Sequence, residues 1–169
     1  MKEKKQQKTN WKNIGQPDLR HLDRSKRLPD QPLVRTVDSA DAAMIILEQH
    51  LGFIDAGITQ VEIITPMDVV VIERANLRHI VEKRQDARER YVRHALATIR
   101  DPYEIWIVEY EDENGKEELR HVYIGAFQGK QHMQVVFIDT TGRVLWNFMH
   151  GDGKALNKHR HGECIYIRP

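Results

Sequence analysis

The residues best suited to chemistry are a histidine and two arginines in one basic stretch of the chain. His79 is followed by Arg84 and Arg88, which stand four residues apart and project from one side of a helix. An imidazole titrates near neutral pH and can transfer protons, and a guanidinium can bind a phosphate through two parallel hydrogen bonds. Because a guanidinium is costly to bury alone, the two arginines either pair with carboxylates or line a cleft between helix and sheet.

A second group of cationic residues lies in a polar loop near the end of the sequence. Arg160 stands between two histidines and is followed by Gly162, which allows a tight turn. The loop is either a phosphate contact made through Arg160 or a solvated surface loop. Zinc binding is a third interpretation, because three imidazoles and a thiol can hold Zn²⁺ tetrahedrally. Its ligands would be His150, His159, His161 and Cys164. Their spacing matches no standard zinc pattern, so neither a metal nor a cofactor is predicted.

The sequence lacks the motifs of several other enzyme classes. It contains no Walker-type phosphate loop, no G-x-G-x-x-G dinucleotide motif, no H-E-x-x-H zinc motif and no G-x-S-x-G nucleophile motif. These absences argue against nucleotide-driven, nicotinamide-dependent and serine-hydrolase chemistry.

Two helical regions must position the first group of residues. Apolar residues at three- and four-residue spacing predict a helix over 40–51 and another over about 76–99. Residues 82–86 contribute nothing apolar, so the second region is either one helix or two helices with a break there. His79 lies on the far side of an unbroken helix from the two arginines. It can meet them only if the helix breaks.

The second half of the chain has the pattern of a sheet. A small hairpin is predicted over 61–65 and 68–73, and tight turns separate the later strands, which are therefore antiparallel neighbours. The later strands are predicted over 104–110, 119–127, 133–138, 144–150 and 163–167. We expect an α+β fold, with helices packed on one face of a four- to five-stranded antiparallel meander.

Composition and charge divide the chain unevenly. Among 169 residues, the first 35 hold ten Lys/Arg and four Asp/Glu (+6), and the remainder holds 16 and 21 (−5). We expect a basic, flexible leader over 1–35, either solvated or acting as a nucleic-acid-binding arm, and a single domain over 36–169. The single cysteine favours the reducing cytoplasm, and no apolar run is long enough for a membrane helix.

Short motifs in a fixed order suggest a family. They are His79-Ile80, the basic stretch from Lys83 to Arg88, Asp101-Pro102-Tyr103-Glu104-Ile105-Trp106, Gly129-Lys130, Asn147-Phe148 and the segment from Leu156 to Tyr166. Over about residues 60–168 this order resembles the phage-associated nuclease-like domains of the barnase–EndoU–colicin–RelE superfamily.

The resemblance implies metal-independent cleavage of RNA. In that chemistry the ribose 2′-hydroxyl attacks the adjacent phosphate and leaves a 2′,3′-cyclic phosphate. Carried over by position, His79 is the acid/base, while Arg84, Arg88 and Arg160 contact phosphate. Asn147 stands where many members have threonine or serine, and its amide can donate a hydrogen bond but cannot transfer a proton.

The resemblance also suggests a setting. It implies a phage or prophage protein of toxin-like character, with RNA as substrate and an immunity or phage head protein as partner. The alternative is an inactive module on the same fold that binds nucleic acid or a phage protein, which the Asn147 departure favours.

Overall fold

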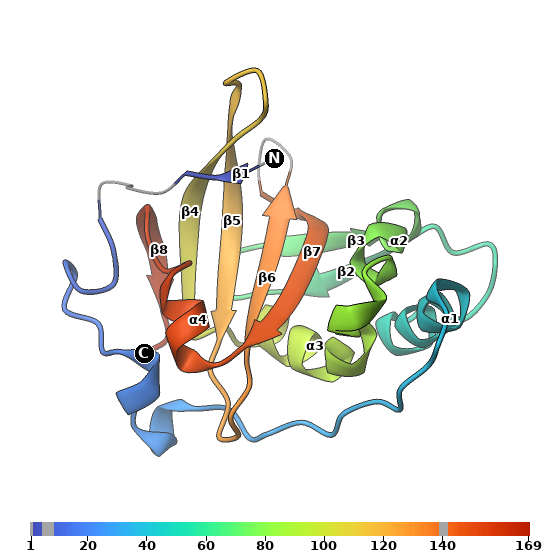
Figure 1. Ribbon diagram of the computed structural model, residues 1–169, viewed down its shortest axis with the longest axis horizontal. Helices are drawn as coiled ribbons and strands as arrows, with labels where there is room; N and C mark the ends of the chain where they lie inside the picture. The colour runs from blue at the N-terminus through green and yellow to red at the C-terminus, as the bar shows by residue number, and fades with distance from the viewer. Residues whose placement is uncertain (1, 5–8, 139–141) are drawn as a thin grey trace.

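A computed structural model describes residues 2–4, 9–138 and 142–169. In this part of the chain, eight strands form one mixed sheet accompanied by four α-helices (Figure 1). The strands are β1 (Lys2–Glu3), β2 (Gln60–Ile64), β3 (Val69–Glu73), β4 (Glu104–Glu111), β5 (Glu117–Gly125), β6 (His132–Ile138), β7 (Val144–Gly151) and β8 (Glu163–Ile167). The helices are α1 (Ala40–Leu51), α2 (Arg78–Val81), α3 (Val92–Arg100) and α4 (Gly153–Asn157).

The α+β class is confirmed, but the predicted number of strands is wrong. The meander β4-β5-β6-β7 is present, and β8 pairs with β4 in the antiparallel sense. The sheet also includes β1 and the β2–β3 hairpin, and β3 runs parallel to β7 through the single pair Val71 and Val144. Tight turns in the sequence reveal neighbouring strands, whereas pairings between distant segments leave no such local signal.

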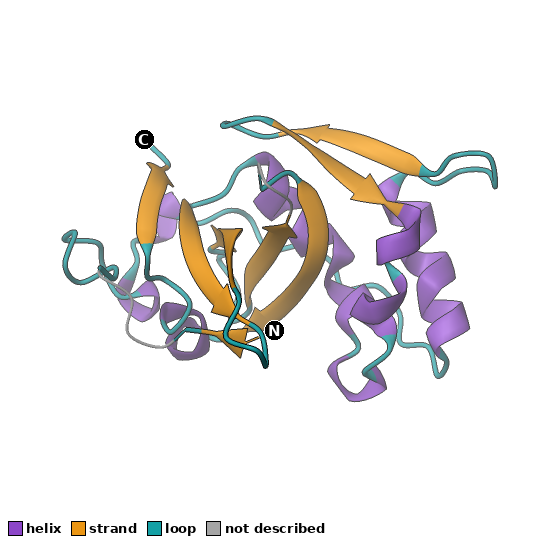
Figure 2. Cartoon of the chain, turned by 90° about the horizontal axis from the view of Figure 1, so that it is seen from above, coloured by secondary structure: helices purple, strands orange, loops and turns teal. Residues whose placement is uncertain are grey.

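Helices cover both faces of the sheet rather than one. Helices α1, α2 and α3 share a buried core with one set of alternate strand residues, including Ile105, Tyr123 and Val135. Helix α4 and residues of the N-terminal segment pack on the other set, including Trp106 and Val122. Seen from above, the strands are strongly curved and most helical turns gather beside one end of the sheet (Figure 2).

The second helical region breaks, as one of the two sequence interpretations expects. Helix α2 ends at Val81, two 3-10 turns follow over Arg84–Asp86 and Arg88–Tyr91, and α3 begins at Val92. Ala87, between the turns, adopts a left-handed conformation with φ of 43°. The polar stretch that begins at Glu82 offers no apolar side chain to the core, so packing does not hold it in a continuous helix.

The N-terminal segment contacts the body of the protein. Leu19 and Leu22 are buried in the core beside α4, and Leu28 pairs with Phe127 through an isolated bridge. The division at residue 35 and the flexibility of the leader stay predictions. None of the helices in the described ranges is long and apolar enough to span a membrane.

Candidate functional site

The broken helical region lies along an edge of β7. Because β3 meets β7 only at Val144, the remaining edge of β7 is open to α2 and the turn that precedes α3, which contact it. The Nε2 atom of His150 lies 3.1 Å from the carbonyl oxygen of Asp86, and the ring of Tyr91 stacks on His150 with centroids 3.6 Å apart. These contacts fix the helical region against the strand.

Three of the five predicted site residues meet at this edge. Arg88 donates from Nη1 to Oδ1 of Asn147 at 2.9 Å, and from Nη2 to Asp86 at 3.1 Å. The ring of His79 lies against Trp146, the neighbour of Asn147, with centroids 5.6 Å apart. The break after α2 thus allows His79 and Arg88 to contact two successive residues of β7, Trp146 and Asn147.

The environment of His79 favours the neutral imidazole. Burial lowers the pKa of His79 below its usual value and outweighs the opposing effects of a backbone hydrogen bond to Trp146 and of the Glu82 carboxylate. Nε2 of His79 is buried and has no hydrogen-bond partner among the described residues. A neutral imidazole can accept a proton, which is the property that a general base needs.

Arg84 is committed to structural contacts beside this cluster. Its guanidinium forms an ion pair with Glu89, whose side chain is fully buried. It also donates to the carbonyl oxygens of Val81 and Val37, at 3.1 and 3.0 Å. Of the two interpretations of the arginine pair, carboxylate pairing therefore describes Arg84, and Arg88 combines a carboxylate with Asn147.

Arg160 lies elsewhere, in the interior between β4, α4 and the N-terminal segment. Its side chain is fully buried and donates from Nε and Nη2 to the two carboxylate oxygens of Glu104, at 2.6 and 2.9 Å. Nη1 donates to the Pro17 carbonyl oxygen and to Asn157, each at 2.9 Å. With these partners, Arg160 does not join His79 and Arg88.

A line of rings and one cation crosses the sheet from Trp146 toward β4. The Arg120 guanidinium lies 3.9 Å from the ring centroid of Trp146 and 4.6 Å from that of Tyr110. Tyr110 is the register partner of Glu3 in β1. Side-chain contacts thus connect Trp146 with Tyr110, whose backbone pairs with the N-terminal strand.

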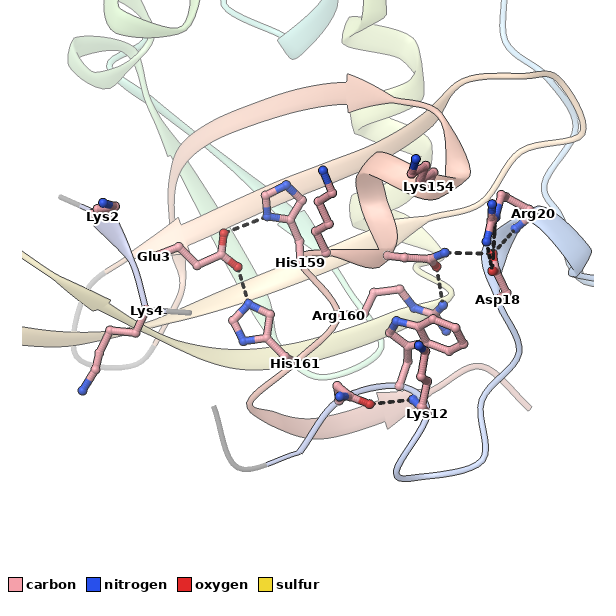
Figure 3. A pocket seen from close by; sticks show the side chains of 14 residues that line it. Lys2, Glu3, Lys4, Lys12, Asp18, Arg20, Lys154, His159, Arg160 and His161 are labelled. Carbon is pink, nitrogen blue, oxygen red and sulfur yellow. Dashed lines mark hydrogen bonds and ion pairs between the residues drawn. The ribbon is translucent and has the colours of Figure 1, made fainter. Parts of the chain in front are cut away.

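A pocket of about 870 Å³ opens at this far end (Figure 3). The Glu3 carboxylate is held between two imidazoles, with His159 Nδ1 at 2.8 Å from Oε2 and His161 Nε2 at 2.6 Å from Oε1. Burial by itself would raise the pKa of Glu3, but the hydrogen bonds from His159 and His161 outweigh it and lower the pKa to about 2.

The four residues of the zinc interpretation do not converge. His159 and His161 face Glu3, His150 faces Asp86 and Gln131, and the Cys164 thiol donates to a backbone oxygen of its own strand. Across residues 2–4, 9–138 and 142–169, no group of three His, Cys, Asp or Glu side chains is placed to hold a metal ion.

The sequence did not point to Glu3 or Arg120 as members of these clusters. Nothing local marks Glu3, because its partners are more than 150 residues away. In an extended strand, His159 and His161 would point to the same side and Arg160 between them to the other. Both rings reach one carboxylate in this way, and Arg160 between them turns inward.

The comparisons with known proteins give one match. The model of a family described as "phage-Barnase-EndoU-ColicinE5/D-RelE like nuclease2" matches residues 48–167. No curated protein and no solved structure matches the chain.

Proposed function

Because the chain belongs to the phage-Barnase-EndoU-ColicinE5/D-RelE like nuclease2 family, as its motifs predicted, we propose that it is a metal-independent endoribonuclease. The family match makes residues 48–167 a nuclease-like domain. RNA as the substrate, a phage or prophage origin, a toxin-like role in the cytoplasm and an immunity or head protein as partner belong to the proposal.

The observation that carries the proposal is the convergence at β7. His79 on α2 supplies an imidazole, Arg88 in the turn before α3 a guanidinium, and Asn147 on β7 an amide. These three residues lie up to 68 positions apart in the sequence, and the fold brings them together. The neighbouring Trp146 ring contacts both His79 and the Arg120 guanidinium. Phosphodiester cleavage requires a group that accepts and returns a proton and a cation beside the phosphate, and His79 and Arg88 can supply them, with Asn147 holding Arg88.

The proposed reaction needs no group beyond the chain and the RNA. His79 accepts the proton of the 2′-hydroxyl as its oxygen bonds to phosphorus. The bond from phosphorus to the 5′-oxygen breaks, and the imidazolium returns the proton to that leaving oxygen. Arg88 stabilises the charge that grows on the phosphate oxygens, and Asn147 holds Arg88 through its Oδ1. Arg84, through its ion pair with Glu89, is a positioning residue that holds the turns carrying Arg88. Arg160 stabilises the fold through its buried ion pair with Glu104.

Cleavage of RNA in the presence of EDTA tests this proposal. We expect 2′,3′-cyclic phosphate ends, and no cleavage of an oligonucleotide with 2′-deoxyribose at the scissile position, because the nucleophile is then missing. The His79→Gln variant should lose about a hundred- to ten-thousand-fold in rate.

The matched control is His50→Gln, because His50 lies on α1, where its Nδ1 is 2.9 Å from the Ile46 carbonyl oxygen. It should cleave like the unmodified protein. Equal cleavage by the His79→Gln variant, or intact RNA with the unmodified protein, would contradict the proposal.

A binding module without catalysis is the second candidate, and Asn147 favours it. An amide at this position cannot transfer a proton, and Arg88 already has a carboxylate partner in Asp86. This candidate predicts that the protein binds RNA without cleaving it and that binding weakens steeply with salt, because neutralised phosphates release counterions. Salt-insensitive binding or none at all would point to a protein partner.

A further inference from the structure

The Glu3 carboxylate occupies a position in which each of its oxygens meets a different imidazole. His159 Nδ1 lies 2.8 Å from one oxygen and His161 Nε2 lies 2.6 Å from the other. The two histidines belong to the loop before β8, and Glu3 belongs to β1, so the contact joins two separate segments (Figure 3). Two N–H groups that converge on one anion are a small anion-binding site.

The surroundings of this contact are cationic. The pocket is lined by seven Lys and Arg side chains and by two carboxylates among the described residues, Glu3 and Asp18. Arg160 is paired with Glu104, Arg20 with Asp18 and Lys4 with Glu109 and Glu117, so the charge of the pocket comes from the remaining lysines. Asp18 forms an ion pair with Arg20 at 2.7 Å. Of the two carboxylates in this lining, Glu3 is therefore the one that faces the two imidazoles. The remaining lysines are Lys2, Lys12, Lys154 and Lys158. Such a concentration of positive charge attracts anions with more than one negative charge.

We propose that His159 and His161 form a binding site for a phosphate group, and that the Glu3 carboxylate fills this site until a phosphate displaces it. The carboxylate and the phosphate share the feature that the site recognises, two anionic oxygens on one centre. His161 Nδ1 is buried and has no partner among the described residues, so the His159–Glu3–His161 contact leaves one polar atom of the site unused.

This inference goes beyond the proposed function, because it concerns a site at the opposite end of the side-chain line that leads from His79. The line passes through Trp146, Arg120 and Tyr110, and Tyr110 pairs in register with Glu3. A nucleic acid bound here through one phosphate would be held by the same sheet face that carries Trp146. Binding at His159 and His161 does not require that His79 cleave anything.

Histidine NMR signals of the full-length chain test the site directly. Two probes are titrated separately, inorganic phosphate and a short 2′-deoxy oligonucleotide, which the proposed reaction cannot cleave. The Cε1–H signals of His159 and His161, assigned with the His159→Gln and His161→Gln variants, should shift on binding. The Glu3→Ala variant should bind the probes at least about tenfold more tightly than the unmodified protein. If the Glu3 carboxylate fills the site more than nine-tenths of the time, it lowers the apparent affinity for a phosphate by at least that factor.

Glu113→Ala is the matched control, since it removes the same charge from an exposed turn between β4 and β5. It should leave the affinity unchanged. Binding of both probes assigns the site to nucleic-acid phosphate, and binding of inorganic phosphate alone supports the site and assigns it to a free phosphate group. Equal affinity in Glu3→Ala and the unmodified protein, or shifts confined to other histidines, would overturn the inference. No cleavage is measured, so its failure is distinct from a failure of the nuclease proposal.

Discussion

The burial of Arg160 leads to a prediction that separates a structural arginine from a catalytic one. Both side chains of the Arg160–Glu104 pair are fully buried, and the Glu104 carboxylate also accepts a hydrogen bond from the Trp106 indole at 3.1 Å. Replacement of Arg160 by methionine preserves much of the volume but leaves the charge of Glu104 without its partner.

The expected loss follows from that uncompensated charge. Removal of one partner of a buried ion pair costs about 3–5 kcal/mol of the free energy of unfolding. For a chain of this length, each kcal/mol corresponds to about 2–4 °C in Tm, so Arg160→Met should lower the Tm by roughly 6–20 °C. The double variant that adds Glu104→Gln should recover part of this loss, since the buried charge is then absent and Trp106 keeps an acceptor.

Equilibrium unfolding in urea, followed by circular dichroism, measures these differences. The matched control is Arg20→Met, which breaks the exposed pair with Asp18 in the same pocket and should cost less than about 1 kcal/mol. If Arg160→Met lost less than about 1 kcal/mol and yet abolished RNA cleavage, the structural role would be refuted, and Arg160 would return to the site that the sequence suggested.

Two further predictions concern acid sensitivity and the N-terminal segment. Burial and the nearby Arg27 lower the pKa of His132 from 6.5 to about 4, so the unfolded chain takes up this proton first as the pH falls. About 3 kcal/mol of the free energy of unfolding, present above pH 6.5, should therefore be lost between pH 6.5 and 4. Urea unfolding at a series of pH values measures this loss. The His132→Asn variant keeps an acceptor for the Phe127 N–H and should show a much weaker dependence of the free energy of unfolding on pH. Leu19→Ala should cost about 2–5 kcal/mol in the same assay because Leu19 is fully buried, whereas a loss under about 0.5 kcal/mol would show that the leader does not pack stably in solution.

Local signals in the sequence determined most of the secondary structure. The predicted helix over 40–51 coincides with α1, where the Ser39 side chain caps Ala42 N–H and Gly52 ends the helix with φ of 98°. The predicted strand over 163–167 coincides with β8. These elements depend on periodicity, caps and turns, which act over a few residues and are therefore legible in the chain itself. The short helix α4 lies in the polar loop predicted near the end of the sequence, and its five residues are too few to show such a period.

The sequence also predicted the family through its motifs, and the family-model match over residues 48–167 confirms that family. His79, Arg88 and Asn147 were predicted from the sequence, together with the condition that the helix break within residues 82–86 for His79 to meet the arginines. Their catalytic roles stay predictions.

Only the tertiary structure decided which charged side chains are already ion-paired within the protein and which can contact a ligand. Arg84 and Arg160 look alike in the sequence as phosphate ligands, but one is bound to the buried Glu89 and the other to the buried Glu104. Glu3 shows no local sign that it lies between two imidazoles from the end of the chain. Ion pairing and burial depend on distances between segments far apart in sequence, and folding sets those distances only when the whole sheet, with β1 at one edge and the β2–β3 hairpin at the other, is assembled.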